Sequence, residues 1–333
     1  MNVCVVMVPY DSGRHSERMG AGPKHLFERA IEPVLSRMGH ELRTETLGLG
    51  ESFPAEISSA FKLSGMIAEA VRIARKDSWF PLVLSRNCNA AVGSVCGCGC
   101  DTTGVVWFDA HGEATTPETT SSGFLDGMGI SILTGQCWNR LAGSIPGFAP
   151  VPGERIALVG VRDIEPDEIN LLKHVGVAHV PINEGFLGPV KEIARKTTGL
   201  YVHFDLDVLD PAEAVANQWS PPGGLSIAGL VDSVKSLTKH APIKAAGFAS
   251  FDPEADHNGR ALDAARMCVE ALFSGLGYAS GARRSPLAFV KGAFSSAKRR
   301  MPSALSVSQA PIMMPGSTFA PCLWSQRAQS TFP

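Results

Sequence analysis

Three residues whose side chains could bind a metal ion stand at alternate positions directly after an apolar stretch. Asp109, His111 and Glu113 follow the run Val105–Phe108. In an extended segment, residues two positions apart project to the same side. We therefore expect these three side chains to converge where a buried strand leaves its sheet, and this spacing is typical of metal ligands.

A second acidic cluster, Asp205 and Asp207, ends the apolar run that begins at Leu200. The two clusters together offer four carboxylates and one imidazole, a set that favours Mn²⁺ or Mg²⁺ over a structural zinc site. In hydrolytic sites, two such ions about 3.5–4 Å apart share a water molecule and make it a nucleophile near neutral pH. The alternative is that each carboxylate caps a turn, but two spaced clusters together favour the metal site.

The composition describes a chain that can bury a large core and has little charge bias. It has 333 residues, a formal net charge of −2 and 44% hydrophobic residues, which gives no indication of binding to nucleic acid or a membrane. The first nine residues lack the features of a signal peptide, and no segment has membrane-spanning length, so we expect a cytoplasmic enzyme. The eight cysteines are expected to be thiols, because a chain of this length needs no disulfide scaffold.

The elements that must position these side chains follow the pattern of βαβ units, in which short apolar runs alternate with segments of helix length. About eight runs are expected, beginning near Val3, Leu42, Pro81, Val105, Ile156, Ala178, Tyr201 and Ile243. Helices are expected over Pro23 to Met38 and Ser58 to Arg75, and Ser226 is expected to cap a helix that ends near His240. The sequence therefore predicts an α/β fold with a parallel sheet.

The composition changes after about Leu276. A loose run of basic residues is followed by a segment rich in Pro, Ser and Met, without a sustained period. We expect residues 1–280 to form the catalytic domain and residues 281–333 to form a peripheral or disordered tail. The alternative is an arm that binds nucleic acid or an acidic partner.

Three stretches resemble motifs of the arginase (ureohydrolase) superfamily. Residues 107–113 (WFDAHGE) are similar to its D-A-H-x-D motif, residues 116–123 (TPETTSSG) to its N-T-P-x-T-x-x-S-G loop, and residues 204–211 (FDLDVLDP) to its F-D-x-D-x-x-D-P motif. The resemblance covers about residues 2–276. It implies a three-layer α/β/α fold with an eight-stranded parallel sheet, and two Mn²⁺ ions at the carboxyl ends of the strands.

Four of the six expected metal ligands match the family as they stand, and these are Asp109, His111, Asp205 and Asp207. The other two positions, Cys88 and Glu113, depart from it. Cys88 stands where the family has a His in a G-G-x-H-S turn, and Glu113 stands where an Asp is usual. A thiolate can bind a metal ion but is softer than an imidazole and must first lose its proton. The alternative is that Cys88 is a small buried residue beside a half-empty site.

Two positions near the expected substrate differ as well. Asp126 stands where arginases have a His proposed as a proton shuttle, and Ser250 stands where they have the Glu that pairs with the guanidinium. Because an unpaired buried charge is costly, the resemblance implies a substrate less basic than arginine, such as an N-hydroxyguanidine. A Cys in the first ligand position is similar to the N-hydroxyarginine amidinohydrolase branch of the superfamily.

The predicted activity is hydrolysis of a C–N bond in a small linear amidine or guanidine. Glu113 is expected to orient the attacking water, and Asp126 to protonate the leaving amine. The candidate substrate-binding residues are Thr115, Thr116, Ser122 and Ser250. Alternatives are activity on agmatine, guanidino acids or formiminoglutamate, or a binding protein that keeps the fold without turnover. The resemblance also implies a homotrimer or hexamer.

Two further groups have plainer expectations. Cys96, Cys98 and Cys100 do not have the spacing of a zinc site and are expected to pack as small residues. His203 shares the face of Asp205 but lies one step deeper in its strand, so we expect it to support the ligands or pack in the core rather than bind the metal.

Overall fold

The computed structural model describes residues 1–50, 55–181 and 185–282, and its centre is a sheet of eight parallel strands. The strands are β1 (Asn2–Val8), β4 (Glu41–Thr46), β5 (Phe80–Ser85), β6 (Thr103–Phe108), β7 (Ile156–Val159), β8 (Ala178–Val180), β9 (Gly199–Asp205) and β10 (Ile243–Ala249). Each of the eight predicted runs falls on one of these strands, so the predicted sheet is confirmed. A short antiparallel pair, β2 (Tyr10–Asp11) and β3 (Arg14–His15), follows β1.

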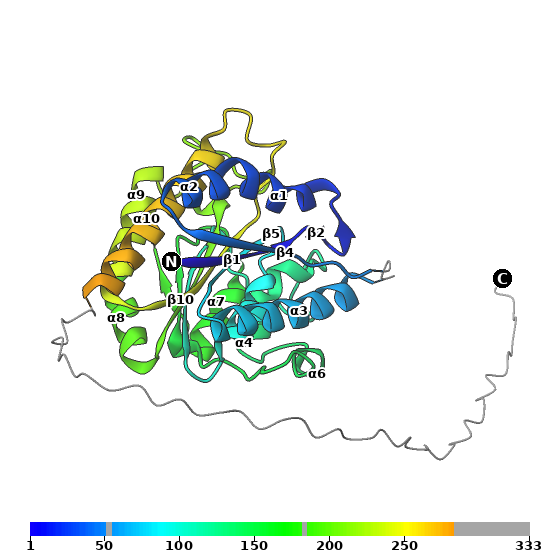
Figure 1. Cartoon of the computed structure of the whole chain (residues 1–333). Coiled ribbons are helices and arrows are strands. Elements are labelled where there is room, and N and C mark those ends of the chain that lie inside the picture. The colour runs from blue at the N-terminus through cyan, green and yellow to red at the C-terminus, as the bar shows by residue number, and fades with distance from the viewer. Residues whose placement is uncertain (51–54, 182–184, 283–333) are drawn as a thin grey trace, which may run out of the picture. The chain divides into compact units, whose positions relative to one another are not determined.

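Helices cover both faces of the sheet and give three layers, with α1 and α2 on one side of the strands and α3 and α4 on the other (Figure 1). The first face carries α1 (Gly22–Leu26), α2 (Glu32–Arg37), α8 (Leu187–Lys196), α9 (Ile227–His240) and α10 (Arg260–Ala282). The second carries α3 (Glu56–Lys76), α4 (Ala90–Cys98), α5 (Gly129–Leu133), α6 (Asn139–Ala142) and α7 (Pro166–Val175). The short 3₁₀ segments are η1 (Arg18–Ala21), η3 (Leu125–Met128), η4 (Gly153–Arg155) and η5 (Leu206–Val208).

Alternate residues of the central strands face opposite layers. In β6, Phe108 packs in the core under α9 and α10, whereas Trp107 packs in the core next to α3 and α4. In β9, Phe204 and Tyr201 divide in the same way. Because side chains alternate along a strand, residues two and four positions beyond Tyr201 also turn toward the α4 side.

The first predicted helix is interrupted by a π segment. Helical structure runs from Gly22 to Arg37, but residues Phe27–Ile31 form a π-helix in which the backbone N–H of Glu32 donates to the carbonyl of Phe27. Pro33 follows directly, and a proline inside a regular helix would lack a donor and clash with the preceding turn. The wider turn therefore lets the chain pass the proline. The predicted helices α3 and α9 are confirmed, and the Ser226 side chain accepts from the N–H of Gly229 as expected for a cap.

Glycines allow α3 and α4 to pack in close contact. A Cβ on Gly93 would lie 2.4 Å from the backbone oxygen of Ser64, and a Cβ on Gly97 would lie 2.6 Å from the Cβ of Val71. The cysteines of the same stretch, Cys96, Cys98 and Cys100, are buried free thiols. This arrangement agrees with the expected packing role.

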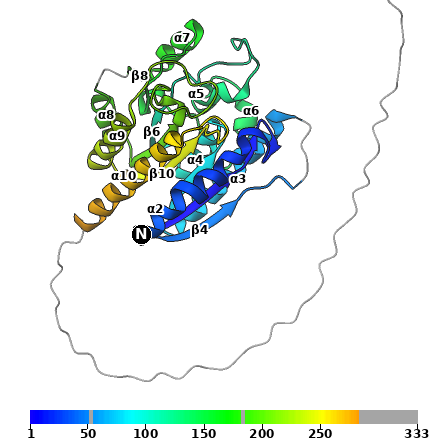
Figure 2. The same ribbon diagram turned by 90° about the horizontal axis from the view of Figure 1, so that it is seen from above.

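The strand order places four segments of distant sequence side by side. Along the sheet the order is β4-β1-β5-β10-β9-β6-β7-β8, and Figure 2 shows β4 and β8 at opposite ends. The segment after β5 leads to α4 on one face of the sheet, whereas the segment after its neighbour β10 leads to α10 on the other face. Ligands of open α/β sheets bind at the carboxyl ends of strands near such a point. At the four central strands, Asp205 ends β9, Asp109 and Ser250 directly follow β6 and β10, and Cys88 lies three residues after β5.

Within the described ranges, no helix combines the length and the apolar composition that crossing a membrane requires. The helix α10 continues through Ala282. The tail predicted for residues 281–333 otherwise lies outside the described residues.

Candidate metal centre

Asp109, Asp205 and Asp207 meet at the carboxyl ends of β6 and β9, and backbone N–H groups hold their orientation. The N–H of Asp207 donates to Asp205 Oδ1 at 2.9 Å, and the N–H of Ala110 donates to Asp207 Oδ1 at 3.1 Å. All three aspartates are buried. The predicted convergence of the two acidic motifs therefore occurs.

His111 lies between two of these carboxylates. Its Nδ1 is 3.4 Å from Asp109 Oδ1 and 3.3 Å from Asp207 Oδ2. Burial works against the charged imidazole, but the two carboxylates outweigh it and raise the pKa of His111 to about 12. Asp109, His111 and Asp207, here called the outer cluster, have potential ligand atoms within 4.8 Å of one another.

Cys88 faces the same carboxylates from the end of β5. Its Sγ donates to Asp205 Oδ2 at 2.8 Å and lies 3.4 Å from Ser250 Oγ. Burial, followed by the charges of Asp205 and Glu113, raises the pKa of the Cys88 thiol well above its usual value. A thiol in these surroundings stays protonated unless a cation binds beside it.

His203, expected to support the ligands or pack in the core, also reaches this group. Cys88, Asp109 and His203, here called the inner cluster, have potential ligand atoms within 4.8 Å of one another. His203 is 1% exposed, and its ring lies 4.3 Å from that of Trp107. Burial lowers the pKa of its imidazole to about 3, so the ring is neutral and able to accept a metal ion.

Glu113 is held in a backbone conformation that few residues adopt. Its φ is 52°, in the left-handed region, and its side chain is buried. Among the described residues, Oε2 has no hydrogen-bond partner. Burial and the charges of Asp109 and Asp126 raise the pKa of Glu113. Strain and an unsatisfied buried oxygen together are typical of a functional position.

The charge of the centre fits divalent cations. Burial and neighbouring carboxylates raise the pKa of Asp109 to about 6 and that of Asp205 to about 7, because His111 alone does not neutralise four crowded acids. The centre offers oxygen, nitrogen and sulfur ligands, and its negative side chains outnumber its positive ones. Bound divalent cations would balance this excess of negative charge. The residues present therefore fit the two-metal site implied by the sequence.

A cavity of about 620 Å³ opens over this centre. Of the four candidate substrate-binding residues, Thr115, Ser122 and Ser250 line it. Thr116 is not among the lining residues, and its hydroxyl lies 3.3 Å from that of Thr119 within the loop. Ser250 has a φ of 58°, so a second strained residue lies beside the centre.

Asp126 also lines the cavity, but its carboxylate forms a salt bridge with Arg86. Its Oδ2 accepts from Nη1 of Arg86 at 2.6 Å, and its Oδ1 accepts from the N–H of Asn89 at 2.9 Å. Arg86 is 2% exposed, and its guanidinium carbon lies 5.1 Å from the ring centroids of both Phe124 and Trp219. The centre therefore contains a fixed guanidinium next to the position expected to release a proton.

Sequence reasoning missed Arg86, Asn217 and Glu168. Asn217 is buried and its amide donates to Asp207 Oδ2 and to the backbone oxygen of Ser250, so it joins two sides of the centre. Glu168 of α7 accepts from the N–H of Ala114 and holds the loop after β6. An arginine directly after the fully buried strand β5 could have been noticed, whereas nothing in the sequence around Asn217 marks it.

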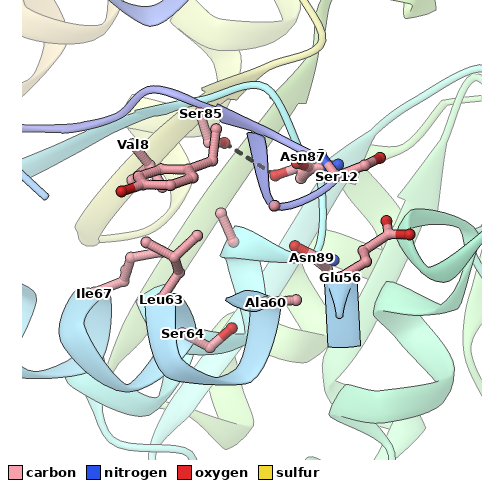
Figure 3. A pocket seen from close by; sticks show the side chains of 13 residues that line it. Val8, Ser12, Glu56, Ala60, Leu63, Ser64, Ile67, Ser85, Asn87 and Asn89 are labelled. Carbon is pink, nitrogen blue, oxygen red and sulfur yellow. Dashed lines mark hydrogen bonds between the residues drawn. The ribbon is translucent and has the colours of Figure 1, made fainter. Parts of the chain in front are cut away.

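A second, small cavity of about 20 Å³ lies behind Asn87, with room for about one water molecule. Figure 3 shows Ser12, Asn87 and Glu56 around it. The N–H of Ser12 donates to Asn87 Oδ1 at 3.3 Å. This cavity is too small for a substrate. The hydrogen bond from Ser12 to Asn87 shows that the chain after β2 lies beside the loop that carries Cys88.

Comparisons with known proteins agree with this geometry. The model of the Arginase family matches residues 1–274. The arginase of Bacillus subtilis is 28% identical over 294 residues, which cover 81% of this chain and 97% of that protein. Human arginase-1 is 32% identical over 183 residues, covering 50% of this chain and 56% of that protein. The solved arginase of Bacillus caldovelox superposes with a TM-score of 0.74 at 23% identity, covering 82% of this chain and 98% of that one.

Proposed function

The chain belongs to the arginase family, and we propose that it releases urea from an arginine-like or N-hydroxyarginine-like substrate by hydrolysis of a C–N bond. The cavity over the acidic centre carries this proposal, because a small substrate in it would lie against five of the six predicted ligands, Cys88, His111, Glu113, Asp205 and Asp207, and the sixth, Asp109, is buried beside them. We further propose two Mn²⁺ ions as the bound metals. When bound, such cations would supply a water molecule that is nucleophilic near neutral pH.

The protein side chains would orient the water and the substrate. Glu113 lines the cavity and, among the residues described, has a buried carboxylate oxygen without a hydrogen-bond partner, and this carboxylate can accept a hydrogen bond from the attacking water. The role of Asp126 as donor of a proton to the leaving amine stays a prediction. Its contacts with Arg86 and Asn89 compete with that role.

The charges around the substrate position favour a guanidine of low basicity. Ser250 offers a neutral hydroxyl, which lies 3.4 Å from Cys88 Sγ. The nearby carboxylate of Asp126 is already paired with the guanidinium of Arg86. A cationic guanidinium would therefore enter without a free carboxylate partner at these two positions, and an unpaired charge in a site away from bulk water is unfavourable.

The proposal is tested by a urea-release assay of Mn²⁺-loaded protein with arginine, N-hydroxyarginine, agmatine and guanidino acids. We expect N-hydroxyarginine to have the highest kcat/KM. Ser250→Glu should shift the ratio toward arginine by about 5–30-fold, because a charge-assisted hydrogen bond exceeds a neutral one by about 1–2 kcal/mol. Ser250→Gln is the matched control, since it adds similar bulk without charge.

Other outcomes would replace this proposal. A preference for agmatine, a guanidino acid or formiminoglutamate would keep the reaction and change the substrate. Fewer than about one metal ion per chain after loading, with no urea from any compound, would indicate a binding protein instead. A cytoplasmic location and assembly as a homotrimer or hexamer also stay predictions, and light scattering would test the assembly.

A further inference from the structure

We propose that the inner cluster is a metal site in which His203 is a ligand together with Cys88 and Asp109, and that it prefers a cation of the Zn²⁺ class over one of the two Mn²⁺ ions proposed above. The part that His203 would play in turnover rests on the proposed function. The binding of metal by these three residues does not.

The first support is the position of the three side chains. Their potential ligand atoms lie within 4.8 Å of one another. Around a tetrahedral Zn²⁺ ion, sulfur, nitrogen and oxygen ligands would lie roughly 3.3–3.6 Å apart. Rotation of side chains can close this difference, and all three residues are at most 2% exposed, so water would compete little for the ion.

The second support is an unsatisfied nitrogen of His203. Among the described residues, Nε2 has no hydrogen-bond partner although it is buried. Burying such a group without a partner costs about 1–3 kcal/mol. A histidine that only packs in the core would leave this cost in place, whereas a bound cation at Nε2 would remove it.

The third support is the partner of the other ring nitrogen. Nδ1 of His203 lies 3.2 Å from the hydroxyl of Tyr201. If Nδ1 carries the proton and donates to that oxygen, Nε2 presents its lone pair, which is the usual arrangement of a metal-binding histidine. The space for this pair comes from Gly247 on β10, where a Cβ would lie 2.3 Å from the Tyr201 oxygen.

The two clusters differ in the metal that they suit. The inner cluster combines a thiolate and an imidazole with one carboxylate, and such ligands select Zn²⁺ and similar cations. The outer cluster has two carboxylates and one imidazole, which suit Mn²⁺ better than a thiolate does. Because Asp109 belongs to both clusters, one carboxylate would contact two unlike ions.

The test is titration of the metal-free full-length protein with Co²⁺, a spectroscopic substitute for Zn²⁺. One equivalent should produce the thiolate-to-cobalt charge-transfer absorption, and Cys88→Ser should abolish it. His203→Leu and His203→Gln should each weaken Co²⁺ binding at least about 10-fold and alter the spectrum, and Tyr201→Phe should weaken it about 10-fold or more through loss of orientation. His179→Leu, at an exposed histidine of β8, is the control and should change neither.

X-ray absorption of the protein with one equivalent of Zn²⁺ tests the same site without relying on the folding of His203 variants. In a His111→Asn background, the ion should have one sulfur at about 2.3 Å and an imidazole nitrogen at about 2.0–2.1 Å. A sulfur-free ion, an ion without imidazole, or folded His203 variants with unchanged Co²⁺ affinity and spectrum would overturn the proposal. Urea release alongside any of these results would refute the site alone, and a normal cobalt spectrum without urea release would refute the proposed function alone.

Discussion

Asp205 links two sides of the candidate centre and is one of its predicted metal ligands. It accepts from Cys88 on one side and from the backbone of Asp207 on the other, and it is 2% exposed. Its carboxylate therefore joins the segment after β5 to the segment after β9. Loss of that charge should affect any cation held there.

We expect Asp205→Ala to abolish binding of two metal ions and to reduce turnover at least 100-fold. The substitution removes a charged oxygen ligand from a site that must balance the positive charge of two divalent cations. Asp210→Ala is the control, since Asp210 belongs to the same motif but does not line the cavity. Metal content by elemental analysis and urea release measure both effects. Two bound metals with full activity in Asp205→Ala would show that the two-metal assignment is wrong.

At this scale the sequence could predict which residues converge but not what surrounds them. Asp109, His111, Asp205 and Asp207 were predictable because their spacing follows the strand period. The pairing of Arg86 with Asp126, 40 positions away, was not, because contacts between distant loops leave no local pattern. The sequence had the same limit for His203. Its depth in the strand predicted that it supports the ligands or packs in the core, and only the fold brings it close to Cys88.

At the scale of elements, the contact between α3 and α4 positions the loop that carries Cys88. The N-terminal end of α4 follows directly after this loop. Gly93 and Gly97 let the two helices approach until backbone and side chain touch. The sequence predicted α3 from its helical period, whereas α4 has apolar residues all round and gives no such signal. The π segment before Pro33 was also hidden, because the apolar pattern continues through it.

We expect Gly93→Ala to destabilise the protein by about 1–3 kcal/mol, because the new methyl group would meet the backbone of Ser64 at 2.4 Å. Gly65→Ala in α3 is the matched control. Its methyl group would have its nearest neighbour at 3.7 Å, and alanine favours helix over glycine by about 1 kcal/mol. Thermal unfolding of both variants should give shifts of opposite sign, and equal shifts would refute the close packing of α3 against α4.

At the scale of the whole molecule, the fold class was predictable and the strand order was not. Eight short runs separated by helix-length segments indicate a parallel sheet, although its edge strands β4 and β8 are not fully buried. The order in which β10 and β9 insert between β5 and β6 depends on packing between distant segments. That order brings the four functional segments together, so the inclusion of Cys88 and Ser250 in the site could be anticipated only through the family resemblance. The division into a domain of residues 1–280 and a tail stays a prediction.

The metal-free protein should lose stability as pH rises. The folded state raises the pKa of Asp205 from an ordinary 3.8 to about 7 and that of Asp109 to about 6. Protons are thus bound more tightly in the folded state, so the stability contributed by these groups is complete below about pH 4 and is lost as pH rises toward 7. The pKa of His111 rises from 6.5 to about 12, so its contribution also declines above pH 6.5.

Thermal unfolding of the chelated protein at pH 5 and pH 8 measures this effect. The difference should be on the order of 1–4 kcal/mol, and Asp205→Asn should reduce it. Saturating metal should raise stability most at pH 8, because metal binds the deprotonated ligands. Greater stability of the chelated wild type at pH 8 than at pH 5, or the same pH dependence in Asp205→Asn, would contradict the raised pKa values of Asp205 and Asp109.

Trp107 gives the centre an optical readout of its own. Its indole N–H donates to Asp109 Oδ2 at 2.8 Å, and its ring lies 4.3 Å from that of His203. A cation bound to either residue would change the electric field and the hydrogen bond at this indole, and so its fluorescence. Metal occupancy could then be followed in real time without a label. Trp107→Phe would separate this signal from those of the other four tryptophans in the chain.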